Sequence, residues 1–220
     1  MNYGLTLRSG LNLRMSGSTV ILANGEFPEH DIPVGILRSA SRIICCDGAA
    51  ESLVNSGLEL VAIVGDCDSL SSQVIEKFGN IIYRIAEQET NDLTKAVKWC
   101  SERGYNDIII LGATGKREDH TIGNISLLAE FAETVIVKMI TNTGIFHPLL
   151  KSAGFSSFKG QQVSIFSIDP KTEITSSGLK YPLVNKKPGN WWEATLNEAT
   201  GESISIEFKG GPLIIFMGFK

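Results

Sequence analysis

The chain has 220 residues, of which 43% are hydrophobic and 20% charged, and its formal net charge is −4. This balance is typical of a soluble globular protein with one large domain or two small ones. The acidic net charge argues against nucleic-acid binding, which depends on neutralising phosphates. No apolar run is long enough to span a bilayer, and residues 1–18 lack the apolar core of a signal peptide. We therefore expect no membrane partner and no secretion, and we interpret residues 1–18 as a flexible N-terminal extension.

The cysteines indicate a reducing compartment. Cys45, Cys46, Cys67 and Cys100 form no Cys-x-x-Cys pair, and no histidine stands at zinc-ligand spacing from them. Free thiols are typical of proteins in the cytoplasm, which is the location we expect.

Strand-like and helix-like patterns alternate through the first two thirds of the chain. The strand candidates are nearly continuous runs of Val and Ile, as in parallel strands that are covered on both faces. They span residues 19–24, 42–47, 60–65, 81–85, 107–112 and 134–139. Two apolar helical stripes lie between them, one formed by Leu93, Ala96, Val97 and Cys100, the other by Ile122, Ile125, Ala129 and Ala132. This order predicts an α/β domain over residues 19–148, with right-handed crossovers and an open, mostly parallel, Rossmann-like sheet.

The pattern changes after about residue 148. Short strand patterns at residues 161–169, 203–208 and 212–218 are separated by clusters of Gly, Pro, Ser and Asn, with no convincing helix. They predict a small all-β sandwich domain over residues 149–220. A segment of this size has a marginal core by itself, so we expect it to pack on the first domain or on a partner subunit.

Three aspartates follow predicted strands. Asp47 closes one strand, and Asp66 and Asp68 follow the next, in "VGDCDSL". Ligands of open parallel sheets bind beyond the carboxyl ends of the strands, and residues i and i+2 of an extended chain point to the same side. Oxygen ligands so placed suit Mg²⁺. The alternative is that one aspartate caps a helix and the other is solvated; Ser69 is a candidate N-cap for a helix that begins near residue 70.

The next helix begins in "QETNDLTKAV", residues 88–97. Its N-cap is Thr90, Asn91 or Asp92, and an acidic residue in the first turn suits the helix dipole. Lys95 lies one turn further on, where it either reaches a phosphate or belongs to a solvated face.

The segment "GATGKREDH" resembles a phosphate-binding loop at first sight. A Walker A loop requires four residues between its glycines and a hydroxyl residue after the lysine. Here two residues separate Gly112 from Gly115, and Arg117 follows Lys116. The segment is therefore not a Walker A loop.

It is instead a glycine-containing turn from a strand into a helix that starts with polar residues. Arg117, His120 and Asn124 lie within about 60° of one another on a helical wheel. Backbone N–H groups at such a turn attract anions, and arginine binds phosphate oxygens with two donors. Asp119 is a candidate metal ligand or proton acceptor. The alternative is a solvated polar face with His120 near a cap.

Acidic loops and a basic turn at one sheet edge together predict a site for Mg²⁺ with a polyphosphate. The ordered segments "LANGEFP", "CCDGA", "VGDCDS", "TNDLTKA", "GATGKREDHTIGN" and "SSGLKYPL" resemble the thiamine pyrophosphokinase family. The resemblance implies an enzyme that transfers the pyrophosphoryl group of ATP to thiamine. It also implies a C-terminal β-sandwich, and a homodimer with thiamine bound where the subunits meet.

The resemblance also assigns roles to individual residues. It places Mg²⁺ on Asp47, Asp66, Asp68 and Asp92, and these residues, together with Arg117 and Asp119, form the catalytic set. The implied ATP and phosphate contacts are Asn24, Gly25, Ser69, Lys95, Gly112, Arg117, His120 and Asn124. The implied thiamine contacts are Gln88, Ser177, Leu179, Trp191, Trp192 and Asn197. The two tryptophans are candidates for stacking on a cationic ring, and packing in the sandwich or an interface explains them equally well.

The chain departs from the family pattern at Lys116, Asn91 and Leu196, where glycine, threonine and serine are common. Two other functions remain open. One is a pyrophosphokinase for another hydroxymethyl heterocycle, such as a pterin. The other is a non-catalytic module that binds a nucleotide or thiamine diphosphate, although a cluster of carboxylates is a poor diphosphate site by itself. Release of AMP from Mg-ATP with thiamine or with a hydroxymethyl pterin discriminates between them.

Overall fold

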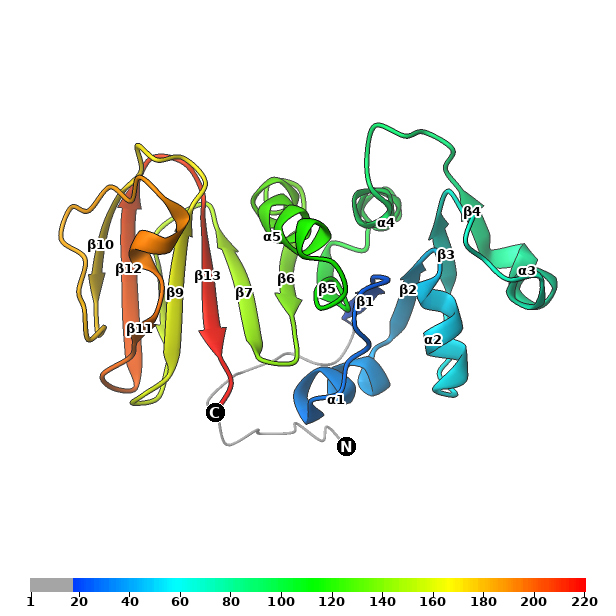
Figure 1. Cartoon of the computed structure of the whole chain (residues 1–220), viewed down its shortest axis with the longest axis horizontal. Helices are drawn as coiled ribbons and strands as arrows, with labels where there is room; N and C mark the ends of the chain where they lie inside the picture. Colours follow the sequence, from blue (N-terminus) through cyan, green and yellow to red (C-terminus); the bar gives the residue numbers. More distant parts are fainter. Residues whose placement is uncertain (1–17) are drawn as a thin grey trace. The chain divides into compact units, whose positions relative to one another are not determined.

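The computed structural model describes residues 18–220 (Figure 1). The predicted N-terminal extension, apart from Ser18, lies outside the described residues. Contacts divide the described chain into two units. The α/β unit comprises residues 18–127 and Thr134–Asn142, and the β unit comprises Leu128–Glu133 and Thr143–Lys220.

The α/β unit is built on a parallel sheet. Its strands are β1 (Thr19–Leu22), β2 (Arg42–Cys46), β3 (Ala62–Gly65), β4 (Ile82–Arg84), β5 (Asp107–Leu111) and β6 (Ile136–Ile140). They pair in the order β6-β5-β1-β2-β3-β4, and every pairing is parallel. Between the strands lie α1 (Asp31–Ser39), α2 (Ala49–Asn55), α3 (Ser72–Phe78), a 3₁₀ turn (Gly79–Ile81), α4 (Asp92–Ser101) and α5 (Glu118–Phe131), whose residues from Leu128 onward are grouped with the β unit. The predicted open parallel sheet is confirmed.

The order in which the chain adds strands to the sheet reverses at β1, although all the strands stay parallel. The chain runs outward through β2, β3 and β4, then returns to place β5 on the other side of β1 and β6 beyond it. Right-handed crossovers put α1 and α2 on one face of such a sheet and α4 and α5 on the other. The reversal leaves a crevice beyond the carboxyl ends of β1 and β5, and ligands of open α/β sheets bind at such a switch point.

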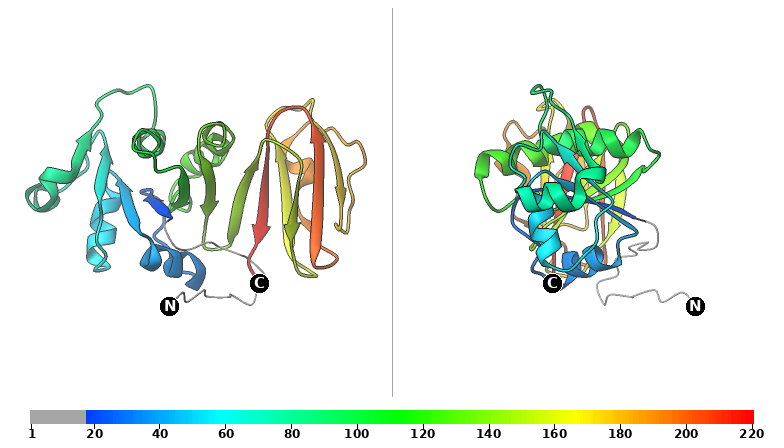
Figure 2. Two further views of the ribbon diagram at one scale, coloured as in Figure 1. Left: turned by 180° about the vertical axis from the view of Figure 1, so that it is seen from behind. Right: turned by 90° about the vertical axis from the view of Figure 1, so that its right-hand side faces the viewer.

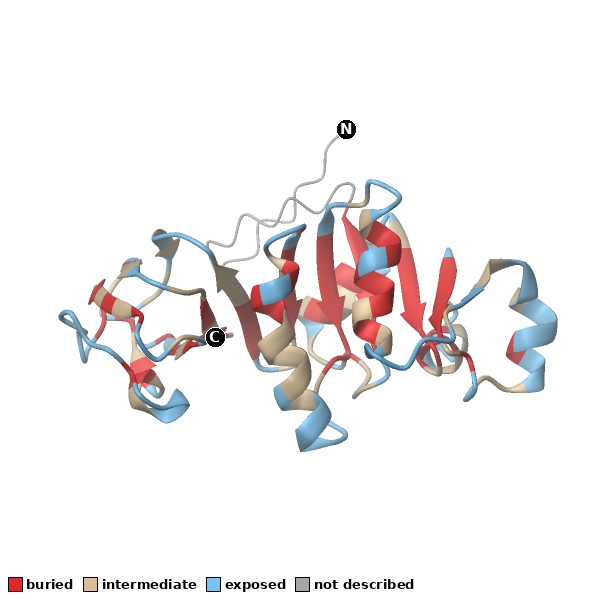
Figure 3. Ribbon diagram, turned by 90° about the horizontal axis from the view of Figure 1, so that it is seen from above, coloured by how far each residue is buried: buried red, intermediate tan, exposed pale blue. Residues whose placement is uncertain are grey.

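The core of this unit consists of the strands themselves. All four residues of β1 and of β3 are buried, as the red strands in Figure 3 show. The predicted apolar stripe on α4 is buried. The stripe on α5 is wrong at its first member, because Ile122 is 58% exposed. Helix α5 is buried only toward its C-terminal end, at Leu128, Ala129 and Phe131, so its first turns remain accessible.

The β unit is an antiparallel sandwich. Its strands are β7 (Gly144–Leu149), β8 (Ala153–Ser156), β9 (Gln162–Ser167), β10 (Glu173–Ser177), β11 (Asn197–Glu198), β12 (Ser203–Lys209) and β13 (Leu213–Gly218). One layer has the order β11-β9-β13-β7 and the other β10-β12-β8 (Figures 1 and 2). Inward side chains such as Val163 and Ile215 from the first layer, with Ile174 and Ile206 from the second, form one apolar core. The predicted sandwich class is confirmed.

Candidate active site

A pocket of about 360 Å³ opens at the switch point of the parallel sheet. Its wall is contributed by loops after β1, β3 and β5 and by the first turns of α4 and α5. The lining residues are Ala23, Asn24, Gly25, Cys46, Asp66, Gln88, Thr90, Asn91, Asp92, Leu93, Lys95, Ala113, Thr114, Lys116, Arg117, His120 and Asn124. The structure therefore brings both predicted groups, acidic and basic, to one pocket.

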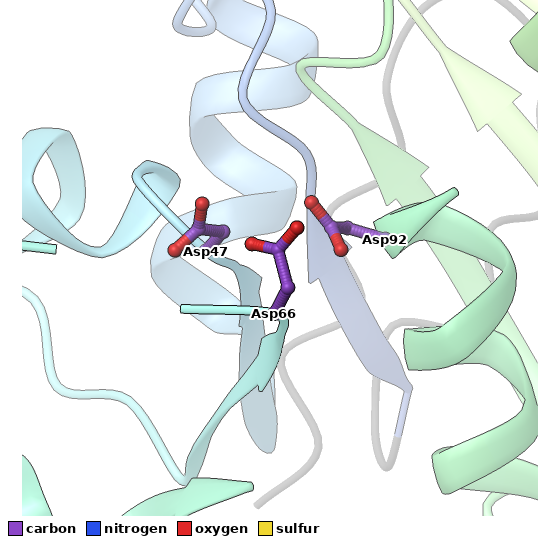
Figure 4. A group of neighbouring side chains, drawn as sticks. All are labelled: Asp47, Asp66 and Asp92. Carbon is purple, nitrogen blue, oxygen red and sulfur yellow. The ribbon is translucent and has the colours of Figure 1, made fainter. Parts of the chain in front are cut away.

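Three carboxylates lie close together at this pocket, and two of them, Asp66 and Asp92, line it. Asp47 follows β2, Asp66 follows β3, and Asp92 is the first residue of α4. One oxygen from each lies within 4.8 Å of the others, and Figure 4 shows the side chains pointing toward one another. Gly65 makes this approach feasible, because a Cβ there would lie 3.1 Å from both the Asp47 Cβ and an Asp92 oxygen. We refer to Asp47, Asp66 and Asp92 as the carboxylate triad.

Asp47 is the most buried member of the triad, at 7% exposure. The Ser69 hydroxyl donates a hydrogen bond to its Oδ2 at 2.5 Å, whereas its buried Oδ1 has no hydrogen-bond partner among the described residues. Burial raises the pKa of the Asp47 carboxyl; the Ser69 hydrogen bond opposes this shift, and repulsion from Asp92 and Asp66 adds to it. A buried carboxylate oxygen without a donor, beside two further carboxylates, suits a divalent cation with hard oxygen ligands.

The structure does not place Asp68 in the triad. Cys67 has φ of 61°, so the chain from Asp66 to Asp68 is not extended, and the i, i+2 argument fails. The backbone N–H of Asp68 instead donates to Asp66 Oδ1 at 3.3 Å, and the Asp68 side chain is exposed. Ser69 is also not the cap of α3, since the side chain of Ser71 accepts from Val74 N.

The first turn of α4 supplies a cation beside the triad. Asn91 is the N-cap, one of the three predicted alternatives, and its side chain accepts from Thr94 N at 2.9 Å. Lys95 is buried, at 3% exposure, and its Nζ lies 3.2 Å from Asp92 Oδ1. The solvated interpretation of Lys95 is therefore wrong: the helix turn directs this ammonium into the pocket rather than to solvent.

The basic side of the pocket is formed by two loops joined by backbone hydrogen bonds. Gly25 N donates to Gly112 O at 2.6 Å, and Glu26 N donates to Thr114 O at 2.8 Å. A Cβ at Gly25 would lie 2.5 Å from Thr114 O, so only glycine fits this approach. Gly112 has φ of 64°, which also favours glycine. Of these two predicted phosphate-contact glycines, Gly25 lines the pocket, and Gly112 holds the Gly25 backbone in place from the neighbouring loop.

The start of α5 presents the remaining predicted polar side chains. Arg117, His120 and Asn124 all line the pocket. Asn124 Nδ2 donates to Ala113 O at 2.8 Å, and Asn91 Nδ2 donates to Asn124 Oδ1 at 3.1 Å, so Asn124 joins α4 and α5. Asp119 does not line the pocket: it accepts from Arg117 Nε at 3.0 Å and from a terminal guanidinium nitrogen. The Arg117 hydrogen bond lowers the pKa of Asp119 to about 2.

The predicted thiamine contacts fall into two structural groups. Gln88 lines the pocket of the α/β unit. In the β unit, Ser177 is exposed at the end of β10, Trp191 packs on Phe166 with ring centroids 5.6 Å apart, and Trp192 is 74% exposed. These side chains are available to a ligand or a partner.

The other two predicted contacts, Leu179 and Asn197, are buried. Leu179 is buried in the core of the sandwich. Asn197 is also buried; its Nδ2 donates to Tyr181 O at 2.6 Å, and its Oδ1 accepts from Tyr181 N at 3.0 Å. Leu196 beside it is 82% exposed and has φ of 56°. A leucine in this conformation is a departure from the usual preference for glycine or asparagine.

The fold and the pocket together define a class of protein. A crevice at the switch point of a doubly wound sheet, with carboxylates on one side and cations on the other, is typical of α/β proteins that bind a nucleotide phosphate with a divalent cation.

Comparison with known proteins specifies the family. The family model of the thiamin pyrophosphokinase catalytic domain matches residues 35–140, and that of the thiamin pyrophosphokinase substrate-binding domain matches residues 144–216. The chain is 30% identical over 190 residues to thiamin pyrophosphokinase 1 of Caenorhabditis elegans, covering 76% of this chain and 75% of the relative. It is 29% identical over 169 residues to thiamine pyrophosphokinase of Bacillus subtilis, covering 73% and 74%. The chain belongs to the thiamine pyrophosphokinase family and is an enzyme of that family.

Solved structures agree on the fold. The crystal structure of thiamine pyrophosphokinase from Bacillus subtilis superposes with a TM-score of 0.76 at 24% identity, covering 92% of this chain and all of that one. The structure of thiamin pyrophosphokinase from Candida albicans gives 0.73 at 21% identity, covering 94% and 90%. Among the described residues, no helix has the length and hydropathy needed to cross a membrane.

Proposed function

We propose that the chain transfers the pyrophosphoryl group of ATP to the hydroxyl of thiamine, giving thiamine diphosphate and AMP. The observation that carries the proposal is the carboxylate triad, with its unpartnered Asp47 oxygen, at a pocket that Lys95, Lys116 and Arg117 also line at the switch point of the sheet. Membership of the thiamine pyrophosphokinase family supports thiamine as the acceptor.

The triad fits Mg²⁺, and Asp47, Asp66 and Asp92 would hold it. When bound, the ion offsets the negative charge of the ATP phosphates and provides electrostatic stabilisation of the transferred group. Asp68 is left out of this set, because its side chain is exposed and does not belong to the group of three carboxylates that lie within 4.8 Å of one another.

The cations of the chain bind and orient the phosphates. Arg117 uses Nε and one terminal nitrogen on Asp119, which leaves its other terminal amino group for a phosphate oxygen. Asp119 therefore orients the guanidinium. Lys95, fixed beside Asp92, adds a second positive charge at the boundary between the acidic and basic sides. Phosphoryl-type transfer depends mainly on such positioning and charge stabilisation.

The reaction forms a bond between the thiamine hydroxyl oxygen and the β-phosphorus and breaks the bond from that phosphorus to the oxygen of AMP. The hydroxyl proton needs an acceptor. Of the two candidates, we assign Asp92, which lines the pocket. Asp119 is a poor base, since Arg117 lowers its pKa to about 2.

The two parts of the chain have separate roles in this proposal. Residues 19–148 bind ATP and Mg²⁺, and residues 149–220 bind thiamine and form a homodimer. Exposed apolar side chains of the β unit support the second role; the four most exposed are Tyr181, Val184, Trp192 and Leu196. Light scattering of the purified chain tests the dimer. All four cysteines are free, which is consistent with a reducing compartment such as the cytoplasm.

A coupled assay tests the proposed reaction. AMP is measured after Mg-ATP is mixed with thiamine, with a hydroxymethyl pterin, or with neither acceptor. We expect AMP and thiamine diphosphate in equal amounts with thiamine only. Formation of AMP with the pterin alone, or without any acceptor, contradicts the proposal.

A further inference from the structure

Lys116 is a cation of the pocket to which the mechanism above gives no role. Its side chain is exposed and lines the pocket together with Asn24 and Arg117. It follows the turn after β5, two residues before the start of α5. It therefore stands at the switch point, where the phosphates of a nucleotide are expected.

The three cations of the pocket differ in what they bind in the absence of ligand. Lys95 is paired with Asp92, and Arg117 with Asp119. Lys116 Nζ donates instead to a neutral acceptor, Asn24 Oδ1, at 3.1 Å. Within residues 18–220, Lys116 forms no ion pair with a carboxylate. An anion can therefore bind this ammonium without first breaking a salt bridge.

Hydrogen bonds hold the backbone next to Lys116, while its exposed side chain is flexible. The two hydrogen bonds of Gly25 and Glu26 to the loop after β5 hold the base of the lysine in register with β1. Its four-carbon stem is flexible and carries three rotatable donors. The hydrogen bond to an amide oxygen holds the ammonium at the pocket, and a charged phosphate oxygen is a stronger acceptor than that amide.

We propose that Lys116 is a phosphate-binding residue of this chain, whose ammonium leaves Asn24 Oδ1 and donates to the phosphate oxygens of ATP when the nucleotide binds. The inference rests on the proposed function, since it takes ATP as the ligand. It assigns Lys116 to nucleotide affinity, with thiamine binding left to other residues.

The test compares variants of the full chain. We expect Lys116→Met to raise the KM for ATP and the Kd for a non-hydrolysable ATP analogue, measured by calorimetry, by about tenfold. The KM for thiamine should stay within about twofold, because the loss is confined to ATP contacts. Lys116→Arg keeps the charge and should retain most of the affinity. Lys116→Gln keeps a donor for Asn24 without the charge and should behave like Lys116→Met.

Lys98→Met is the matched control, since Lys98 is exposed on α4 and does not line the pocket. The inference is overturned if Lys116→Met binds the ATP analogue with wild-type affinity. It is also overturned if Lys116→Gln does so, because the role of Lys116 would then be its hydrogen bond to Asn24. An equal loss in Lys98→Met also overturns it, since net charge alone would be responsible. If the wild-type chain makes no thiamine diphosphate but Lys116→Met still weakens analogue binding, the proposed reaction fails and the phosphate contact stands.

Discussion

In the proposed function the carboxylate triad is needed for activity, and the repulsion between its charges destabilises the fold. Replacing Asp47 by asparagine separates these two effects. The substitution preserves size and removes one buried negative charge. We expect Asp47→Asn to abolish most of the activity and, in the absence of divalent cations, to make the folded protein more stable. A gain in stability on removing the charge of a proposed metal ligand is expected for a site whose carboxylates repel one another without a cation.

The magnitude follows from the distances. Two unit charges within the 4.8 Å of the triad repel by about 1 kcal/mol in water and by about 3 kcal/mol at an effective dielectric constant near 20. Asp66 and Asp92 are partly exposed, so the lower figure applies to each, about 2 kcal/mol in total. Asparagine weakens the hydrogen bond from Ser69, which offsets about 1 kcal/mol. The net gain of about 1 kcal/mol corresponds to a rise in Tm of about 2–4 °C.

The pH dependence of the stability tests a second time whether Asp47→Asn stabilises the folded chain. Burial, with repulsion from Asp92 and Asp66, raises the pKa of Asp47 in the folded chain. Its destabilising contribution is therefore absent below the ordinary carboxyl pKa, grows as the pH rises from that value to the folded pKa, and is constant above the folded pKa. The advantage of Asp47→Asn should be full at neutral pH and should shrink as the pH falls toward about 4.

The assay is scanning calorimetry with EDTA and again with Mg²⁺ and an ATP analogue. Adding Mg²⁺ and the analogue should raise the Tm of the wild-type chain more than the Tm of Asp47→Asn. Asp68→Asn is the control, because Asp68 is an exposed aspartate outside the triad. The electrostatic reasoning is refuted if Asp47→Asn has a lower Tm in EDTA than the wild-type chain. It is also refuted if Asp68→Asn raises the Tm in EDTA as much as Asp47→Asn does.

Three further outcomes are expected. Asp66→Asn should lower turnover by at least about a hundredfold and Asp68→Asn by less than about threefold; similar losses would contradict the assigned triad. Gly25→Ala should destabilise the fold by about 1–3 kcal/mol in urea melts, since its Cβ meets two backbone carbonyls. Gly35→Ala, with nothing within 4 Å, should stabilise α1 by about 0.5–1 kcal/mol. Burial raises the pKa of Cys45 to about 12, and all four cysteines are buried, so a thiol reagent should label them rapidly only in denaturant.

The residue pattern predicts the parallel sheet and two members of the triad, Asp47 and Asp66, and the family resemblance adds the third, Asp92. Short runs of Val and Ile that alternate with helical patterns are typical of parallel strands, and an aspartate directly after such a strand lies at the carboxyl edge. Asp68 was misplaced because the left-handed conformation of Cys67 has no signal in residue type. The burial of Lys95 was also invisible, since it depends on how α4 meets β3, which spacing along one helix does not specify.

The β unit was harder to read strand by strand. β10, "EITSS", carries one large apolar residue, and β8, "AGFS", carries another. Such short segments lack the alternation that marks a half-buried strand. β7 contains Pro148, a residue that usually argues against a strand interior, yet it pairs with Ile214 of β13. These strands form because they pair with longer or more apolar strands, and those partner strands are distant in sequence.

The origin of the pocket residues has a consequence for how the protein acquires activity. The side chains of the pocket come from segments after β1, β3 and β5 and from the starts of α4 and α5, so no contiguous fragment holds more than part of the site. Parallel pairings between distant strands form late, because loop closure must precede them. During refolding, affinity for an ATP analogue should therefore develop with the slowest phase of sheet assembly, after most of the helical signal has been recovered. Ligand binding then reports completion of the whole sheet.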